Sequence, residues 1–292
     1  MSGGFARVRA GLALVFITGI SATTLAGDSA IKYVLDLESG ILNNTKVTFS
    51  GNQPVLSSDV ARSGRYSMKT VLNRATSPTS YRTEVSLNGR VKFVQGEDNW
   101  YGFSVYLPSN YVADPVWEIV AQWHNIPDEN LGESNTNLNP PLGLHTEKGK
   151  WTLLSIWDSR PVTNKANYEG KQNYDLGAYE TNKWTDWVFH IKWVPDSTGI
   201  LQVWKDGKLV IDKRGPIGFN DAEVPYFKFG LYKGWRDRQN PAGVVSERVL
   251  YHDEIRVAGA GGRYEDVAPG GTLKVPDDQE PKAPTGLTIQ PH

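Results

Sequence analysis

The sequence of 292 residues contains no cysteine. This absence excludes a disulfide framework, a cysteine-based zinc site and a thiol nucleophile. The chain also contains no GxSxG nucleophile elbow, which leaves a serine hydrolase poorly supported, and no HExxH zinc motif or EF-hand loop. Stability must therefore come from packing, for which 10 Trp, 13 Tyr and 9 Phe supply large apolar surfaces. Aromatic faces of this kind also stack on sugar rings.

An excess of charge of either sign is missing as well. The chain has 31 basic and 32 acidic residues, which gives a formal net charge of −1. Because proteins that bind a phosphate backbone are usually basic, we expect no nucleic-acid partner. An anionic ligand would have to be bound by a local cluster of cations.

A long apolar run occurs only near the N-terminus. Arg7 and Arg9 precede the run AGLALVFITGI, and small residues follow up to TLAGDS. This order predicts a signal peptide over residues 1–26, cleaved after Ala26, and a secreted or periplasmic protein. The run is short for a membrane span, so an uncleaved anchor is the alternative, and we expect no membrane association after cleavage.

Helical periodicity is nearly absent after Ala30. Short alternating segments separated by Gly, Pro, Asn and Asp predict an all-β sandwich or barrel, with a tight turn at Asp206-Gly207. Strands are predicted over residues 67–72, 81–87, 99–107, 117–124, 150–157, 184–194, 199–211, 226–234 and 248–258. Residues 125–147 read as a long loop that walls or covers a cleft. We expect one domain over residues 30–268, followed by a disordered tail or linker stub over 269–292.

Three of the predicted strands place polar residues on a single face. These are Arg82, Glu84 and Ser86 in YRTEVS, Gln122 and His124 in VAQWHN, and Tyr226, Lys228 and Tyr232 in YFKFGLY. Because side chains alternate along a strand, the apolar residues between them can enter a core. If the three polar rows line one concave sheet, they bring together a guanidinium, an amide, an imidazole and a phenol.

That set of groups suits β-elimination on a uronic acid polymer. The C5 proton of a uronate is weakly acidic while its carboxylate is charged, so the carboxylate must be neutralised and the enolate-like intermediate stabilised. Arg82 and Gln122 are expected to do this as hydrogen-bond donors. Tyr232 and His124 are the candidates for the proton transfers, since a nearby cation lowers the pKa of a tyrosine and a neutral histidine accepts a proton directly.

The stereochemistry of the sugar divides these two roles. In glucuronate or mannuronate the C5 hydrogen and O4 lie on the same side of the ring, so one tyrosine can serve both steps. In guluronate or iduronate they lie on opposite sides, which suits a histidine base with a tyrosine acid. We assign His145, His190 and His252 to solvated sheet faces.

Three short motifs resemble those of a known enzyme family. RTEV at 82–85, QWH at 122–124 and YFKFGLYKG at 226–234 resemble, in order, the R(T/S)E(L/V), Q(I/V)H and YFKxGxY motifs of jelly-roll polysaccharide lyases that include alginate lyases. The longer runs GPIGFNDAEVPYFKFGLYKG and WTDWVFHIKWVPDSTGILQVWKDGKLV are more similar to the glucuronan lyase and heparin lyase I-like branch. The resemblance covers roughly residues 30–265.

The resemblance implies a fold and a set of residue roles. The fold would be an all-β jelly-roll sandwich of two antiparallel sheets, concanavalin-like. Arg82 and Gln122 would neutralise the carboxylate, His124 would act as base or neutraliser, and Tyr232 would be catalytic base and acid. Lys228, Tyr226 and Glu84 are expected to bind substrate. Ser86, where the alginate lyase pattern often has Arg, and Lys233-Gly234, in place of Asn-Gln, depart from that pattern and make alginate a weaker candidate.

The resemblance also implies a structural calcium ion. Asp253 in YHDEIRV would hold it with Glu38 in DLESG or with backbone oxygens, because hard cations take oxygen ligands. The alternative is that Asp253 only caps or pairs locally. Catalysis itself needs no redox or nucleotide cofactor, since it consists of proton transfer and charge stabilisation.

The sequence therefore predicts a carbon–oxygen lyase, a monomer that acts on an anionic polysaccharide and leaves unsaturated uronate ends. Glucuronan, a β-1,4-linked polymer, is the preferred substrate, with heparin-like glycosaminoglycan and alginate as alternatives. A glycoside hydrolase needs two carboxylates flanking the bond, but Glu84 stands alone and Asp253 and Glu254 point to opposite faces. A non-catalytic carbohydrate-binding or lectin-like domain would not need Arg, Gln, His and Tyr in combination.

Overall fold

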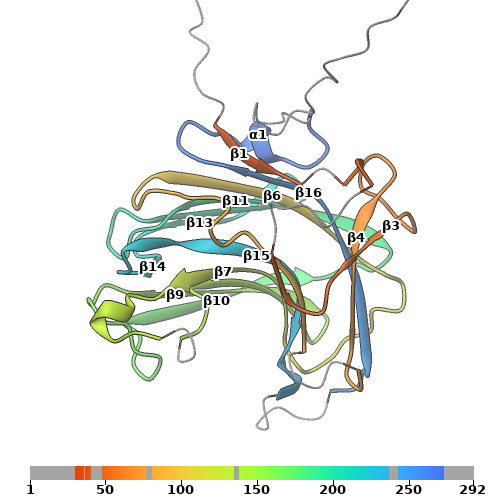
Figure 1. Cartoon of the computed structure of the whole chain (residues 1–292), viewed down its shortest axis with the longest axis horizontal. Helices are drawn as coiled ribbons and strands as arrows, with labels where there is room; N and C mark the ends of the chain where they lie inside the picture. Colours follow the sequence, from red (N-terminus) through yellow and green to blue (C-terminus); the bar gives the residue numbers. More distant parts are fainter. Residues whose placement is uncertain are drawn as a thin grey trace, which may run out of the picture.

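The computed structural model describes residues 30–35, 37–40, 48–76, 81–134, 138–236 and 243–272. These residues form two eight-stranded sheets that stack face to face as a β-sandwich (Figure 1). Strand pairing is antiparallel except between β14 and β9, and the fold is the β-jelly roll that the sequence predicts. The predicted signal peptide and residues 273–292 of the predicted tail lie outside the described residues.

The strands of each sheet come from distant parts of the chain. The first sheet has the order β13(Lys208–Arg214), β12(Ile200–Lys205), β11(Lys183–Lys192), β6(Asp98–Leu107), β16(Glu247–Ala258), β4(Ser67–Asn73) and β3(Val55–Ser57), with β1(Ile31–Val34) paired to β16. The second has the order β10(Gly170–Ala178), β9(Lys150–Asp158), β8(Leu142–Glu147), β7(Glu118–Ile126), β15(Glu223–Lys233), β5(Arg82–Ser86) and β2(Thr48–Gly51), with β14(Gly218–Phe219) beside β9. Short helical turns are η1(Glu129–Leu131), η3(Gly234–Arg236) and α1(Tyr264–Val267).

Each predicted strand is present, but the segment predicted as one long loop is not a loop throughout. β7 runs to Ile126, and residues 142–147 form β8, an interior strand between β7 and β9. In β8, Leu142, Leu144 and Thr146 alternate into the core. The Asn- and Pro-rich residues just before this strand obscured its alternation in the sequence.

The core between the sheets is built from aromatic side chains. Trp123 and Phe227 of the second sheet both contact Tyr101 of the first, each at 5.3 Å between ring centroids. Trp151 of the second sheet packs edge-on against Trp187 of the first at the same separation. Buried aromatic surface of this size supplies the packing that a chain without disulfides requires.

His252 is a core residue, which corrects its assignment to a solvated sheet face. It is fully buried, and its Nε2 lies 3.0 Å from the carbonyl oxygen of Val120 on the other sheet. Because a carbonyl oxygen only accepts, Nε2 carries the proton in this contact. Burial lowers the pKa of His252 to about 3, so it stays neutral.

Asp253 and Glu38 lie on either side of one loop, residues 62–66. Asp253 Oδ2 accepts hydrogen bonds from the amides of Arg62 and Ser63, at 2.7 and 3.3 Å. The Glu38 carboxylate accepts from the amides of residues 65 and 66, at 2.8 and 3.0 Å. With N–H donors on these oxygens, the two residues as arranged do not fit a cation site, and the described chain holds no group of three or more His, Asp or Glu suited to a metal. Calcium stays a prediction.

The folded part extends slightly past the predicted boundary at residue 268. Arg256 donates to the carbonyl oxygens of Ala268 and Gly271, at 2.9 and 3.1 Å. The amide of Gly270 donates to Glu254 at 2.8 Å. These contacts attach residues 269–271 to β16. In the part of the chain that is described, no helix is long and apolar enough to span a membrane.

Gly230 allows β15 to approach β5 closely. Its φ is +135°, and a Cβ added there would lie 2.2 Å from the carbonyl oxygen of Thr83. Next to it, β15 carries one more residue than β7 between Phe229 and Tyr232. The glycine thus accommodates an irregular stretch between Lys228 and Tyr232.

Gly230→Ala should lower the free energy of unfolding by about 3 kcal/mol or more, because it adds a clash to backbone strain. Gly89 is the matched control: its φ is +69°, but an added Cβ would meet nothing within 4 Å. Gly89→Ala should cost about 1 kcal/mol from strain alone. Urea unfolding of both variants measures this, and equal losses would contradict the close approach.

Asp221, between β14 and β15, is a buried carboxyl beside Glu133. Burial and the Glu133 carboxylate raise the pKa of Asp221 to about 8. Glu133 in turn accepts from the amide of Asp128 at 3.0 Å. Asp128 accepts from the amide of Ala222 at 3.1 Å, so these carboxyls connect the loop after β7 to the start of β15.

The raised pKa predicts a pH-dependent stability. A carboxyl with a folded pKa above its unfolded pKa of 3.8 favours folding most at low pH, and this contribution is lost as the pH rises towards 8. Asp221→Asn cannot ionise, so the melting temperature of this variant minus that of the wild type should rise from pH 5 to about pH 8 and then level off. A melting-temperature difference that does not change with pH would contradict the assignment.

Candidate active site

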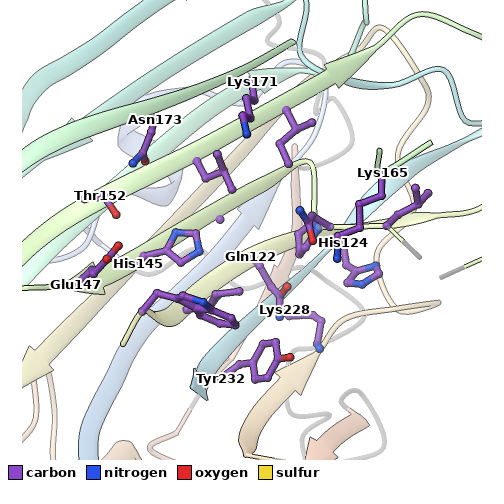
Figure 2. Close-up of a pocket in the computed structure, with 18 of the residues that line it drawn as sticks. Gln122, His124, His145, Glu147, Thr152, Lys165, Lys171, Asn173, Lys228 and Tyr232 are labelled. Atoms are coloured by element: carbon purple, nitrogen blue, oxygen red, sulfur yellow. The ribbon is translucent and has the colours of Figure 1, made fainter. Parts of the chain in front are cut away.

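A cleft of about 1240 Å³ lies on the face of the second sheet that points away from the core (Figure 2). Its floor is formed by β2, β5, β15, β7, β8, β9 and β10, and residues 138–140 with Lys165 and Tyr168 also line it. Six of the predicted site residues line it: Arg82, Gln122, His124, Tyr226, Lys228 and Tyr232. The three polar rows predicted from the sequence therefore face one cleft.

Strand register brings these residues into cross-strand pairs. Tyr232 pairs with Arg82 of β5. On the other side of β15, Lys228 pairs with Gln122, and Tyr226 pairs with His124. Directly opposed side chains have Cβ atoms about 4.5–5.5 Å apart, so each pair is within contact distance.

An irregularity in β7 changes which residues face the cleft. Trp117 and Ile119 line it with one parity, whereas Gln122 and His124 line it with the other. The pairing of β7 with β8 shifts between Ile119 and Ala121, where two steps along β7 match one step along β8. This bulge puts Val120 and Ala121 in the core and returns Gln122 to the cleft side.

Arg82 carries an uncompensated charge at the cleft. Its guanidinium carbon lies 4.0 Å from the centre of the Tyr232 ring, a cation–π contact. Among the residues described, no carboxylate forms an ion pair with Arg82. The guanidinium is therefore available to a carboxylate of a ligand.

Glu84 lies beneath the cleft floor and does not line it, which differs from the substrate-binding role expected from the sequence. It is 1% exposed, and its two oxygens accept from Lys228 Nζ at 2.7 Å and from Gln122 Nε2. Lys228, which is 3% exposed, thus has its charge balanced within the protein. The contact also orients the Gln122 amide, with its nitrogen towards Glu84.

His124 presents a free acceptor nitrogen. Its Nδ1 lies 3.0 Å from the carbonyl oxygen of Asn125 and must donate there, which leaves the lone pair on Nε2 when the ring is neutral. Burial lowers the pKa of His124, and the charges of Lys228 and Arg82 act in the same direction. The ring stacks on Tyr226 at 5.5 Å between centroids, and burial raises the pKa of that tyrosine.

The residues that depart from the alginate lyase pattern have structural partners. Lys233 is fully buried and donates to Glu118 at 2.6 Å and to the carbonyl oxygen of Val116 at 3.1 Å. A Cβ added to Gly234 would lie 2.5 Å from the Trp117 ring. Lys233 and Gly234 thus fix the end of β15 directly after Tyr232. Ser86, the other departure, is buried and pairs with Lys228 in register.

Several residues of the cleft were missed by the sequence analysis. His145 was assigned to a solvated face, but it lines the cleft and is half-buried. Cleft-lining residues near it on β8 and β9 are half-buried as well. Trp117 lines the same wall and packs edge-on against Tyr232 at 5.3 Å. On β10, Lys171 and Asn173 line the far end. Alternation in GLHTE and in GKQN was the available signal, since every second residue of each faces the cleft.

The carboxylates of the cleft do not suit a glycoside hydrolase. Within the described residues, Glu147 is the one acidic side chain in the lining, and it pairs with Lys148 at 3.1 Å. Hydrolysis of a glycosidic bond would require two carboxyl groups facing the substrate. Cations, amides, histidines and tyrosines predominate instead.

Solved structures similar to this chain include two kinds of lyase. An endo-beta-1,4-glucuronan lyase from the fungus Trichoderma reesei is 23% identical with a TM-score of 0.62, over 83% of this chain and 95% of that one. The alginate lyase AlyC3 is 14% identical with a TM-score of 0.45, over 66% of this chain and 75% of that one. At 23% identity, the likeness to the glucuronan lyase shows the fold. No curated protein matches the sequence at a significant level.

The sequence itself matches a family model. The model described as polysaccharide lyase covers residues 37–256, which include Arg82, Gln122, His124 and Tyr232. The match spans more than half of the chain and both sheets of the sandwich. This jelly-roll protein therefore belongs to the polysaccharide lyase family.

Proposed function

We propose that this lyase cleaves a β-1,4-linked glucuronate polymer by β-elimination. The observation that carries the proposal is the pairing of Arg82, whose charge is uncompensated, with Tyr232 in a cleft that also holds Gln122 and His124. The similarity to a structure described as an endo-beta-1,4-glucuronan lyase supports this choice of polymer. Heparin-like glycosaminoglycan and alginate remain the alternative substrates.

Arg82 and Gln122 neutralise the carboxylate of the substrate. The guanidinium offers two parallel N–H donors, which match the two oxygens of a carboxylate. The Gln122 amide gives one N–H to Glu84 and keeps the second for the substrate. Both interactions strengthen as negative charge moves from C5 onto the carboxylate in the intermediate.

Tyr232 takes the C5 proton and returns it to the leaving oxygen. As a phenolate beside Arg82, Tyr232 Oη accepts the proton, and the electron pair of the C5–H bond forms the C4=C5 double bond. The C4–O4 bond breaks with its electrons on O4, which then receives the proton from the phenol. The elimination consumes no water and uses no redox cofactor.

One tyrosine suffices only when the C5 hydrogen and O4 share a side of the ring, as in glucuronate. His124 Nε2 is the alternative base for a sugar with the opposite arrangement. For glucuronate, His124 acts as a neutral group near the carboxylate or a hydroxyl, since its lowered pKa keeps it uncharged.

We also propose that the protein is exported and acts as a monomer on its polymer. We infer export from the signal-peptide pattern of residues 1–26. An exported enzyme requires a soluble substrate outside the cytoplasm. A polymeric substrate fits an open cleft whose lining crosses seven strands of one sheet.

Tyr232→Phe should lower kcat on glucuronan by at least about 100-fold, because the variant lacks the group that moves the proton. The readout is the absorbance of the unsaturated product at about 235 nm over a panel of glucuronan, alginate and heparin. Tyr106→Phe is the control, since Tyr106 lies on the other sheet and bonds Asn182. New reducing ends without this absorbance would contradict elimination and favour hydrolysis.

The lowered pKa of His124 predicts the acidic side of the pH profile. The neutral form exists above the pKa, so kcat/KM should fall on acidification with a midpoint below about 6.5, the ordinary value for histidine. An NMR titration of the His124 ring, assigned by comparison with His124→Gln, should give the same midpoint. A midpoint above 6.5 in both measurements would show that the charged form is favoured at the site.

A further inference from the structure

His145 occupies the floor of the cleft next to Gln122. In register it pairs with Ile119 of β7 and with Thr152 of β9. Its ring leans along β8 over Gly143, because a Cβ added to Gly143 would lie 2.9 Å from His145 Cε1. Gly143 itself pairs with Gln122. The imidazole thus fills the place that a side chain at position 143 would take, beside the amide expected to bind the reacting sugar (Figure 2).

Aromatic contacts connect the position of His145 to that of Tyr232. The His145 ring meets Trp117 edge-on, with centroids 6.3 Å apart and planes at 85°. On its other side Trp117 meets Tyr232 in the same manner, at 5.3 Å and 84°. Trp117 and buried Ile119 form the apolar part of the floor near His145, and Thr152 and Glu147 form its polar part.

The imidazole of His145 is neutral. Burial lowers its pKa to about 4, and among the described residues it has no acidic partner in an ion pair. A neutral imidazole has one N–H donor and one acceptor nitrogen, and in His145 a hydrogen bond to the backbone of Gly143 uses the donor. The remaining acceptor nitrogen suits a hydroxyl, which can donate to it, and does not suit a carboxylate or a sulfate, which only accept and need their charge to be balanced.

The floor changes character across the strands. Around β5 and β15 it offers the cation Arg82, which suits the carboxylate of the reacting uronate. Three strands from β5, at β8, it offers the neutral ring of His145, and the described cleft-lining residues of β8 and β9 include Glu147 and Thr152 but no cation. Adjacent strands lie about 4.8 Å apart, so a polymer crossing the sheet places a neighbouring sugar over β8 while the reacting sugar lies over β7 and β15.

Resting on the proposed function, we propose that His145 binds an unsubstituted hydroxyl group of the sugar next to the reacting uronate. Gly143 makes room for the ring, and Trp117 fixes its orientation. His145 is then a specificity-determining residue: a sulfated sugar would place an anion against a neutral ring and near Glu147, where the described lining of β8 and β9 holds no cation to balance it. The site should accept plain glucuronate polymer and reject a polymer sulfated at that hydroxyl.

The test compares His145→Gln, His145→Ala and Gly143→Ala with the wild type on glucuronan. Loss of one hydrogen bond should raise KM by about 3- to 10-fold, with a smaller change in kcat. Gly143→Ala should reproduce the effect with His145 intact, because the new methyl group displaces the ring. His190→Gln is the matched control: His190 stacks on Trp100 on the other sheet, and its replacement should leave KM unchanged.

Binding measured without turnover separates this inference from the proposed reaction. In a Tyr232→Phe background, calorimetric titration with glucuronate oligosaccharides should show the same rise in Kd for His145→Gln, and the parent should bind O-sulfated oligosaccharides more weakly than plain ones. Melting temperatures identify variants that do not fold, and the folded variants then test the inference about His145. A KM and Kd within twofold of the parent in folded His145 variants, or no binding of any glucuronate oligosaccharide, would overturn the inference (about 0.4 kcal/mol for twofold). Elimination that persists in Tyr232→Phe would instead overturn the proposed function and leave the Kd comparison valid.

Discussion

The chemistry of the cleft depends on one buried carboxylate, that of Glu84. A buried ion is costly unless it is paired and hydrogen-bonded, and Glu84 is both, through Lys228 and Gln122. Removing it would leave Lys228 as a buried, unbalanced cation and would free the Gln122 amide to rotate. Because Glu84 balances Lys228, Arg82 is left as the cation at the centre of the site whose charge is available to substrate.

As a result, the cleft floor has a charged side and a neutral side. On one side, the guanidinium of Arg82 lies against the ring of Tyr232, so the group that binds a carboxylate and the group that moves a proton are fixed relative to each other. On the other side, burial keeps His124 and His145 neutral. A uronate carboxylate therefore finds a charged partner in one place, while sugar hydroxyls find neutral partners beside it. The irregularities at Gly230 and between Ile119 and Ala121 make this possible, since they set which residues reach the cleft.

The position of a residue can be predicted from the sequence where it follows from alternation on the residue's own strand. Arg82, Gln122, His124 and Tyr232 were assigned correctly to one cleft, because each lies on a strand with a strong apolar face. Strand β8 was missed, and with it His145, because Asn- and Pro-rich residues precede a short strand that lies in the interior of the sheet. Glu84 lies on the same face of β5 as Arg82, but Lys228 and Gln122 cover it. Alternation along one strand gives the face of a residue and does not show whether side chains of other strands bury it.

By itself, the sequence determined the all-β class, the strands, the face on which each polar row lies and the resemblance to polysaccharide lyases, since these depend on local periodicity and on short motifs. Only the tertiary structure decided which polar groups are neutralised, which are free and which lie below the floor. It also placed His252 in the core and turned Asp253 and Glu38 towards the amides of one loop. The physical reason is that charge compensation and burial are properties of neighbours distant in the chain, such as Glu84 and Lys228, and alternation within a strand carries no information about them.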